Sequence, residues 1–227
     1  MTLYKHIFDD NPLTLASRTS ALAIAQSRIV QQQIAPTPCE IVTITTKGDR
    51  ILDRSLADAG GKGLFIKELE KALLAGSCDI AVHSMKDMET HFADGTMIAA
   101  VLPREDRRDA LVGPYTALAD LPKGAVIGTA SVRRKALLLH ARPDLQIQLL
   151  RGNINSRLDA LAAGRFDAII LAMAGLRRLR VKVPHTPLEA NEMLSAVAQG
   201  AVAIQARMAV DTRSEAVLQA CAKLTCN

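Results

Sequence analysis

The chain has 227 residues, a formal net charge of +5 and a sequence pI near 9.2. Aromatic residues make up only 3% of it, so aliphatic side chains must form the core, which favours alternating strands and helices over an aromatic-rich β-sandwich. The mild positive charge suits an anionic ligand or an ordinary solvated surface, but it is too small to indicate nucleic acid. No apolar run reaches the length of a membrane span. We expect a cytoplasmic protein without a signal peptide.

The cysteines show neither Cys-x-x-Cys spacing nor a cluster with histidine. The four are Cys39, Cys78, Cys221 and Cys226. We therefore expect neither a metal site nor a disulfide framework, and a reducing compartment.

The first third of the chain begins with a predicted strand over residues 13–17 and a helix over residues 21–34. Ser20 is well placed as the N-cap of that helix. Arg18, between the strand and the helix N-terminus, could hold a carboxylate together with the positive end of the helix dipole. After a strand over residues 40–45, a long polar connection carries Gly60, Gly61, Lys62 and Gly63, which could approach an anion or be a mobile surface loop.

A helix over residues 64–75 precedes the short apolar run 80–82, which is typical of a strand buried on both faces. Lys86 and Asp87 follow it. In open α/β sheets ligands bind at the carboxyl ends of the strands, although a solvated turn is the common alternative for such a pair.

A strand over residues 97–102 and a charged run over residues 103–109 lead into a second lobe, in which strands and helices alternate up to residue 171. We take the charged run as a solvated crossover, and the alternation predicts a largely parallel sheet with right-handed connections. Two strand-to-helix turns carry planar donors that suit carboxylates, namely Arg133, Arg134, Arg151 and Arg157. Residues 196–204 read as a turn and a strand that could return to the first sheet, and residues 212–224 as a final helix.

Several motifs in this order resemble the porphobilinogen deaminase (hydroxymethylbilane synthase) family over roughly residues 13–207. They are Ala16-Ser17-Arg18-Thr19-Ser20 with Gln26, Thr46-Lys47-Gly48-Asp49, Gly60–Phe65, Asp79–Asp87, Arg104-Glu105-Asp106 with Arg108-Asp109-Ala110, Gly128–Arg134, Arg151-Gly152-Asn153 and Phe166–Ala172.

The resemblance implies an α/β fold in which two lobes, with mixed but mostly parallel sheets and a double crossover, resemble type II periplasmic binding proteins. We expect domain 1 at residues 1–104 plus 197–212, domain 2 at residues 105–196, and the remnant of a third domain at residues 213–227. The implied activity condenses four porphobilinogen units into linear hydroxymethylbilane with release of ammonia, on a dipyrromethane cofactor held covalently by a cysteine.

Each candidate site residue takes its role from the matching motif. Asp87 would be the catalytic carboxylate, stabilising positive charge on pyrrole nitrogens as ammonia leaves, and Lys86 beside it would hold acetate and propionate groups. Arg18, Ser20 and Gln26 would meet the incoming substrate, and Lys62 would belong to a mobile loop that covers the site. The cofactor and growing chain would be held by Thr129, Ser131, Arg133, Arg134, Arg151 and Arg157.

The family's cofactor cysteine lies in a Gly-x-Cys-x-x-Pro-Ile turn of the third domain, and this sequence has no such turn. We therefore expect impaired elongation, with very weak porphobilinogen consumption, and a monomer if the third domain were present. Two alternatives remain. One is a non-catalytic two-lobed binding protein for carboxylated pyrroles or other small anions, and the other is the effector half of a transcription regulator, which would need a helix-turn-helix segment. Neither nucleic acid nor membrane is an expected partner.

Overall fold

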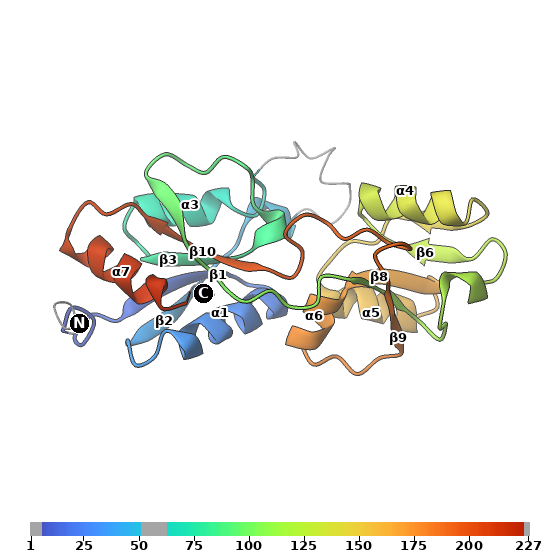
Figure 1. Cartoon of the computed structure of the whole chain (residues 1–227), viewed down its shortest axis with the longest axis horizontal. Coiled ribbons are helices and arrows are strands. Elements are labelled where there is room, and N and C mark those ends of the chain that lie inside the picture. Colours follow the sequence, from blue (N-terminus) through green and yellow to red (C-terminus); the bar gives the residue numbers. More distant parts are fainter. Residues whose placement is uncertain (1–5, 51–62, 225–227) are drawn as a thin grey trace. The chain divides into compact units, whose positions relative to one another are not determined.

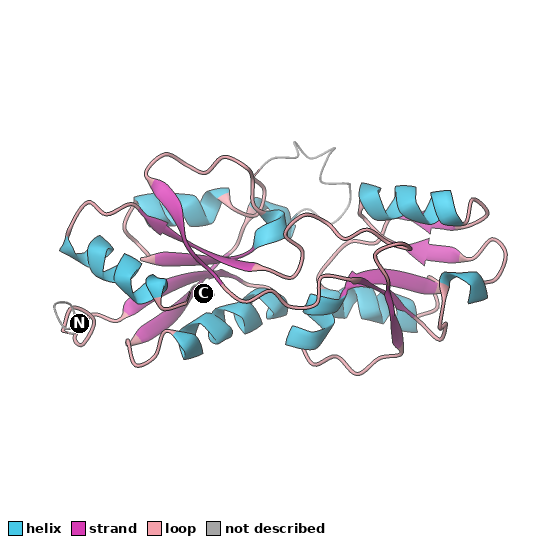
Figure 2. Ribbon diagram, in the orientation of Figure 1, coloured by secondary structure: helices cyan, strands magenta, loops and turns pink. Residues whose placement is uncertain are grey.

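The structure is a computed structural model that describes residues 6–50 and 63–224, and the chain divides into two compact units. Among the described residues, unit 1 comprises 6–50, 63–104 and 201–224, and unit 2 comprises 105–200. Within the described residues, the chain leaves unit 1 after Arg104 and returns after Gly200, so it crosses between the units twice. Figure 1 follows this path by colour, and Figure 2 shows helices and strands in both units.

Unit 1 is built on a five-stranded sheet in the order β2-β1-β3-β10-β4. Its strands are β1 (Leu13–Arg18), β2 (Cys39–Ile44), β3 (Ile80–Ser84), β4 (Thr96–Val101) and β10 (Val202–Arg207). Its helical segments are α1 (Ala21–Gln33), α2 (Lys47–Arg50), α3 (Lys67–Leu74), the 3-10 turn η1 (Met85–Asp87) and α7 (Thr212–Ala222). Strands β1, β2 and β3 are parallel, whereas β10 runs antiparallel to both β3 and β4.

The two faces of this sheet are covered by different helices because side chains alternate along each strand. Leu13 and Leu15 share one core with Val30 of α1 and Val217 of α7. Ala16 lies in the opposite core, with residues of α3. The central strands therefore carry continuous apolar runs, which explains why they could be predicted from the sequence.

Unit 2 has a second five-stranded sheet in the order β7-β6-β8-β5-β9. Its strands are β5 (Asp109–Val112), β6 (Val126–Gly128), β7 (Gln146–Gln148), β8 (Ala168–Ala172) and β9 (His185–Leu188). Its helical segments are η2 (Leu118–Asp120), α4 (Val132–Ala141), α5 (Ile154–Ala162) and α6 (Met173–Arg178). Strands β6, β7 and β8 are parallel and β5 is antiparallel to its two neighbours, so the sheet is mixed, as the fold class requires.

The structure differs from the sequence expectations in several places. Strand β9 was not predicted, because a proline interrupts it, which an edge strand tolerates. The charged run was expected to be solvated, but its last residue, Asp109, is fully buried at the start of β5. The return to unit 1 falls at Gly200/Ala201, because Gln199 donates hydrogen bonds from Nε2 to the Arg107 carbonyl (2.8 Å) and to Asp109 Oδ1 (2.9 Å) within unit 2.

Helix α7 packs on unit 1, although residues 213–227 were expected to begin a further domain. Its buried residues include Val217, Ala220 and Cys221, which join the core beneath β1 and β10. Asp211 caps the helix by accepting a hydrogen bond from the Ser214 N–H at 2.7 Å. Of residues 225–227, which include Cys226, no structure is described.

Candidate active site

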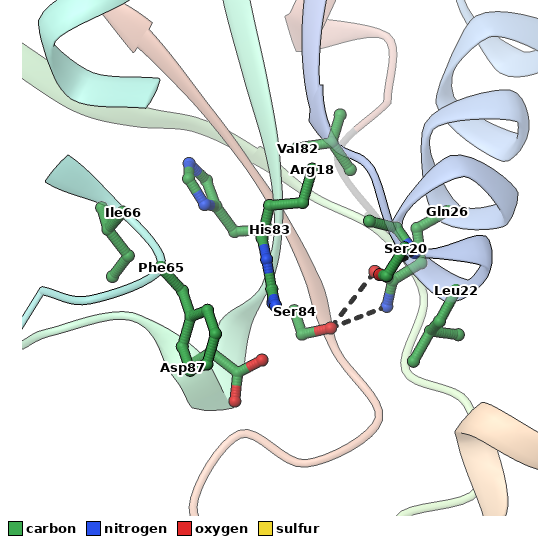
Figure 3. Close-up of a pocket in the computed structure, with 11 residues that line it drawn as sticks. Arg18, Ser20, Leu22, Gln26, Phe65, Ile66, Val82, His83, Ser84 and Asp87 are labelled. Carbon is green, nitrogen blue, oxygen red and sulfur yellow. Dashed lines mark hydrogen bonds between the residues drawn. The ribbon is translucent and has the colours of Figure 1, made fainter. Parts of the chain in front are cut away.

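A pocket in unit 1 lies where β1 and β3 end, at the carboxyl edge of the parallel strands (Figure 3). It is an open hollow of about 400 Å³ including its solvent-filled mouth. Its lining residues are Arg18, Ser20, Leu22, Ala23, Gln26, Phe65, Ile66, Val82, His83, Ser84 and Asp87. Four of the predicted site residues, namely Arg18, Ser20, Gln26 and Asp87, are thus brought together.

The guanidinium of Arg18 is held by the protein from two sides. Its Nη2 forms an ion pair with Asp49, and its Nε lies 3.2 Å and 3.3 Å from the two carboxylate oxygens of Asp49. Its Cζ lies over the ring of Phe65, 4.0 Å from the ring centroid. Asp49 also accepts hydrogen bonds from the backbone and hydroxyl of Thr46, at 3.2 Å and 2.7 Å. Burial opposes ionisation of Asp49, but the hydrogen bonds of Arg18 and Thr46 outweigh it and hold its pKa below the ordinary value. Arg18 therefore enters the pocket already oriented.

Helix α1 is tied to the pocket by two side chains from its first turns. Ser20 accepts a hydrogen bond from the Ala23 N–H at 3.3 Å and so caps the helix, as predicted. Gln26 is buried, and its Nε2 lies 3.0 Å from Ser84 Oγ, which fixes the end of β3 against the helix (Figure 3). Both residues therefore shape the pocket whether or not a ligand contacts them.

Asp87 and Lys86 lie on the 3-10 turn that follows β3, and both are exposed. Asp87 lines the pocket mouth, and within the described part of the chain no hydrogen bond or ion pair engages its carboxylate. A carboxylate in this position is available to a cationic group of a ligand. Lys62, the remaining residue predicted for this side, lies outside the described residues.

His83 is a pocket residue that the sequence analysis did not select. It is 5% exposed, and burial, reinforced by the charge of Arg18, lowers its pKa to about 4. The imidazole is therefore neutral at physiological pH. Apart from the motif Asp79–Asp87, nothing in the sequence indicated that this strand residue lines a pocket.

In unit 2, helix α4 begins at the carboxyl end of β6, and Ser131 caps it. The Thr129 hydroxyl accepts a hydrogen bond from the Ser131 N–H at 3.2 Å, so Thr129 and Ser131 both stabilise this turn. Arg133 and Arg134 follow in the first turn of α4, where their side chains were predicted to hold ligand carboxylates.

Both arginines bind a carboxylate of the protein itself. Nη2 of Arg133 and Nη2 of Arg134 each donate to Asp109 at 2.6 Å, and Gln199 donates to the same carboxylate. Burial opposes ionisation of Asp109, but the charge and hydrogen bonds of the arginines outweigh it and keep its pKa below the ordinary value. Arg134 is buried, whereas the Arg133 side chain is 26% exposed, so Arg133 is the better placed of the two to reach a ligand.

Arg151 and Arg157 flank the next turn of unit 2, between β7 and α5. Arg157 donates from Nε to the Gly152 carbonyl at 2.8 Å, and Asn153 caps α5 by accepting from the Ser156 N–H at 2.9 Å. Gly152 has φ of +105°, and a Cβ there would lie 2.3 Å from the Ser156 hydroxyl, so the turn requires glycine. The predicted residues of unit 2 thus occupy two neighbouring turns of one sheet edge.

The thiols of the described cysteines are poor nucleophiles. Burial raises the pKa of Cys39, Cys78 and Cys221 to about 12 in each case, and Cys221 is fully buried in α7. Across residues 6–50 and 63–224, no group of three or more His, Cys, Asp or Glu residues could hold a metal ion. Among the described residues, no helix is long and apolar enough to span a membrane.

Two α/β units with mixed five-stranded sheets and a double crossover define a fold of the kind seen in two-lobed ligand-binding proteins. Similar solved structures are a nutrient binding protein from Burkholderia cenocepacia bound to methionine (TM-score 0.52, 13% identity, covering 92% of this chain and 90% of that one) and CbnR, a LysR family transcriptional regulator (TM-score 0.58, 12% identity, 95% and 70%). At these identities the likeness concerns the fold alone.

Residues 13–215 match the family model described as "Porphobilinogen deaminase, dipyromethane cofactor binding domain". The porphobilinogen deaminase of Nitrobacter hamburgensis is 52% identical over 202 residues, which cover 86% of this chain and 64% of that protein. The porphobilinogen deaminase of Francisella tularensis subsp. holarctica is 49% identical over 221 residues, covering 94% and 72%. The chain belongs to the porphobilinogen deaminase family, and it spans about two thirds of the length of these relatives.

Proposed function

We propose that this chain is a hydroxymethylbilane synthase-type transferase, which condenses porphobilinogen units into a linear tetrapyrrole and releases ammonia. Family membership supports the reaction class. The observation that carries the proposal is the pocket of unit 1. There the carboxylate of Asp87, which no described residue engages, and the oriented guanidinium of Arg18 line the same hollow. We also propose a cytoplasmic location and, together with a third domain, a monomer, as the family likeness implies.

Porphobilinogen carries two carboxylates, a pyrrole N–H and an aminomethyl group, and the pocket offers a partner for each kind. Arg18 can share a substrate carboxylate, because a guanidinium presents five donors and the protein uses only part of them. Asp87 can accept from the pyrrole N–H or the ammonium group at the mouth. Phe65 and Ile66 supply apolar contact for the ring.

Each addition breaks the carbon–nitrogen bond of one aminomethyl group, and the nitrogen leaves as ammonia. The freed methylene carbon bonds to the α-carbon of the pyrrole that accepts it, and that carbon loses its proton. Positive charge develops on the pyrrole nitrogen as ammonia leaves, and an ionised Asp87 stabilises this charge. The same carboxylate can receive the proton that the accepting pyrrole loses.

The residues of unit 2 fit a carboxylated dipyrromethane in part. Arg133, Arg151 and Arg157 would hold its carboxylates, with Thr129 and Ser131 shaping the turn beside them, while the buried Arg134 would act mainly through its contact with Asp109. When bound, the dipyrromethane supplies the pyrrole carbon to which the first substrate unit adds. Covalent attachment does not fit the three described cysteines, because Cys78 and Cys221 are buried and the pKa of each of the three thiols is raised to about 12.

The second candidate function is binding of carboxylated pyrroles without elongation. The shielded thiols favour it for this chain alone, because an acceptor pyrrole that is not anchored can dissociate between additions. On this basis we propose very weak porphobilinogen consumption by the chain by itself.

The test compares wild type with Asp87→Asn and with the control Asp94→Asn, which alters an exposed carboxylate of unit 1 that does not line the pocket. Porphobilinogen binding is measured by calorimetry, ammonia release by a coupled assay, and intact mass after incubation. We expect Asp87→Asn to lower ammonia release by about 10²-fold or more, as for other removed electrostatic stabilisers, with binding within about threefold. The control should match wild type.

Binding without ammonia release in wild type would support the second function. Unchanged ammonia release in Asp87→Asn would contradict the assigned role of Asp87. Rapid turnover accompanied by a mass adduct on Cys221 would contradict the proposal that the described cysteines are shielded.

A further inference from the structure

The inner wall of the pocket in unit 1 contains a buried polar side chain that the proposed mechanism does not use. His83 lines the pocket, yet its Nε2 is buried and lacks a hydrogen-bond partner within 3.5 Å among the described residues. An unpaired buried polar atom costs free energy, so its surroundings need an explanation.

Gln205 of β10 supplies the first part of that explanation. It is fully buried, and its Nε2 donates to Glu70 Oε1 at 2.9 Å and to Thr96 Oγ1 at 2.8 Å. The Thr96 hydroxyl donates to the Ala93 carbonyl, so towards Gln205 it can only accept. Both neighbours of Nε2 are therefore acceptors, and the amide has one favourable orientation, with Oε1 directed away from them.

Gln205 Oε1 and His83 Nε2 are both buried, and neither has a hydrogen-bond partner among the residues that the structure describes. The two side chains lie on the same face of the sheet, because His83 pairs with Ala203 and Gln205 pairs with Ala81 in the antiparallel ladder. The proximity of the Gln205 side chain also partly offsets the lowering of the His83 pKa that burial causes. An amide oxygen can only accept, so the hydrogen of the neutral imidazole belongs on Nε2.

A neutral imidazole with its hydrogen on Nε2 has a bare Nδ1, which is an acceptor. Because Nε2 is buried in the wall and His83 lines the pocket, Nδ1 is the ring nitrogen left to face it. We propose that His83 is a ligand-binding residue whose tautomer is set by Gln205 and whose Nδ1 accepts a hydrogen bond from an N–H group of the bound pyrrole. This inference rests on the proposed function, since it names the contact that porphobilinogen makes inside the same pocket.

The charged groups around His83 are compatible with a neutral imidazole whose Nδ1 accepts a hydrogen bond. Arg18 faces it from β1 with Asp49 of α2 as counter-ion, Glu70 of α3 is reached through Gln205, and Asp87 lies at the pocket mouth. Protonation of His83 would place a second cation beside Arg18 and remove the acceptor. Down to about pH 5 the imidazole stays neutral, so the contact is independent of pH over the working range of most enzymes.

The experiment reads the tautomer directly by long-range ¹H–¹⁵N correlation on protein labelled at histidine. The signals of His83 are assigned as those missing from His83→Asn among the five histidines of the chain. We expect a protonated Nε2 and a bare Nδ1 that do not change between pH 8 and pH 5. Porphobilinogen should move the Nδ1 signal towards the hydrogen-bonded position and leave Nε2 unchanged.

Two binding variants accompany the spectra. His83→Leu removes the acceptor and should weaken porphobilinogen binding about five- to tenfold, as expected for one lost hydrogen bond. His83→Asn places an amide oxygen near the position of Nδ1 and should stay within about threefold of wild type. Gln205→Leu should remove the fixed tautomer and give a mixed Nδ1/Nε2 population.

A hydrogen on Nδ1 in wild type, or an Nδ1 signal that porphobilinogen leaves unmoved, would overturn the inference even if the variants fail to fold. If porphobilinogen binds and Asp87→Asn abolishes ammonia release while Nδ1 does not respond, only the His83 contact is wrong. If wild type does not bind porphobilinogen at all, both the proposed function and the His83 contact are wrong.

Discussion

Asp109 offers the sharpest test of the packing in unit 2. Its carboxylate is fully buried and accepts from Arg133 and Arg134 at 2.6 Å each and from Gln199 at 2.9 Å. Asp109→Asn keeps the shape of the side chain but leaves both guanidinium groups without their counter-charge. Removal of one partner from a buried ion pair costs about 3–5 kcal/mol, which is a large part of a typical domain stability of about 5–15 kcal/mol.

Urea unfolding followed by the fluorescence of Tyr115 measures this loss in unit 2, since the chain contains no tryptophan and only one other tyrosine. With a slope of about 1–3 kcal/mol per molar urea, a loss of 3 kcal/mol lowers the midpoint by at least about 1 M. The control is Asp159→Asn, because Asp159 is an exposed carboxylate of the same unit that lies on α5. If both variants unfolded within 0.5 M of wild type, the assigned energetic role of Asp109 would be wrong.

The dependence of stability on pH in the acid range gives a second test of the role of Asp109. The pKa of Asp109 is held below its ordinary value, so its contribution to stability is fully present above the unfolded pKa of about 4. It is lost as the pH falls from there through the folded pKa. Wild type should therefore lose more stability than Asp109→Asn between pH 5 and pH 3, and an identical acid dependence in both proteins would contradict the assignment.

Three further predictions concern unit 1. Asp49→Asn removes the counter-ion that orients Arg18 and should weaken porphobilinogen binding about tenfold, measured by calorimetry, with no change expected for Asp94→Asn. Gly48→Ala would place a Cβ 2.3 Å from the ring of Phe65, so we expect the free energy of unfolding, measured by thermal unfolding, to fall by about 1–3 kcal/mol. Phe65→Leu should partly relieve this loss in the double variant. Additive losses would show that the two residues do not collide. The three described cysteines should resist iodoacetamide at pH 8 in the folded protein and react once it is unfolded, because burial raises the pKa of each thiol to about 12. Rapid labelling of any of them in the folded protein, located by peptide mapping, would contradict this.

Much of the fold could be predicted because its central strands are apolar on both faces and its helices have local start signals. Ser20 was predicted as an N-cap and is one. Strand β9 was missed because its proline and polar residues carry no strand pattern, and only pairing with β5 defines it. Helix α7 was predicted as a helix but placed in another domain, since a sequence pattern does not show which core receives an apolar face.

The candidate site divides in the same way. The motifs placed Arg18 and Asp87 at strand ends and Gln26 in the helix after the first strand. The structure gathers them in one pocket because parallel strands end at a common edge. Asp49 was part of a recognised motif, but its bond to Arg18 depends on how α2 folds against β1. The charged run hid Asp109, because its buried place in β5 depends on pairing with β8.

The sequence by itself determined the family, the alternation of strands and helices, and the residue types at the edges of both sheets, because these follow from local patterns and short motifs. Only the tertiary structure decided which charges are already neutralised within the protein. Arg134 pairs with Asp109, and Gln205 lies on the same face of the sheet as His83, across elements that are distant in the chain. These pairings depend on strand order and register, which arise from long-range packing, and they separate side chains that can bind a ligand from those that hold the site in shape.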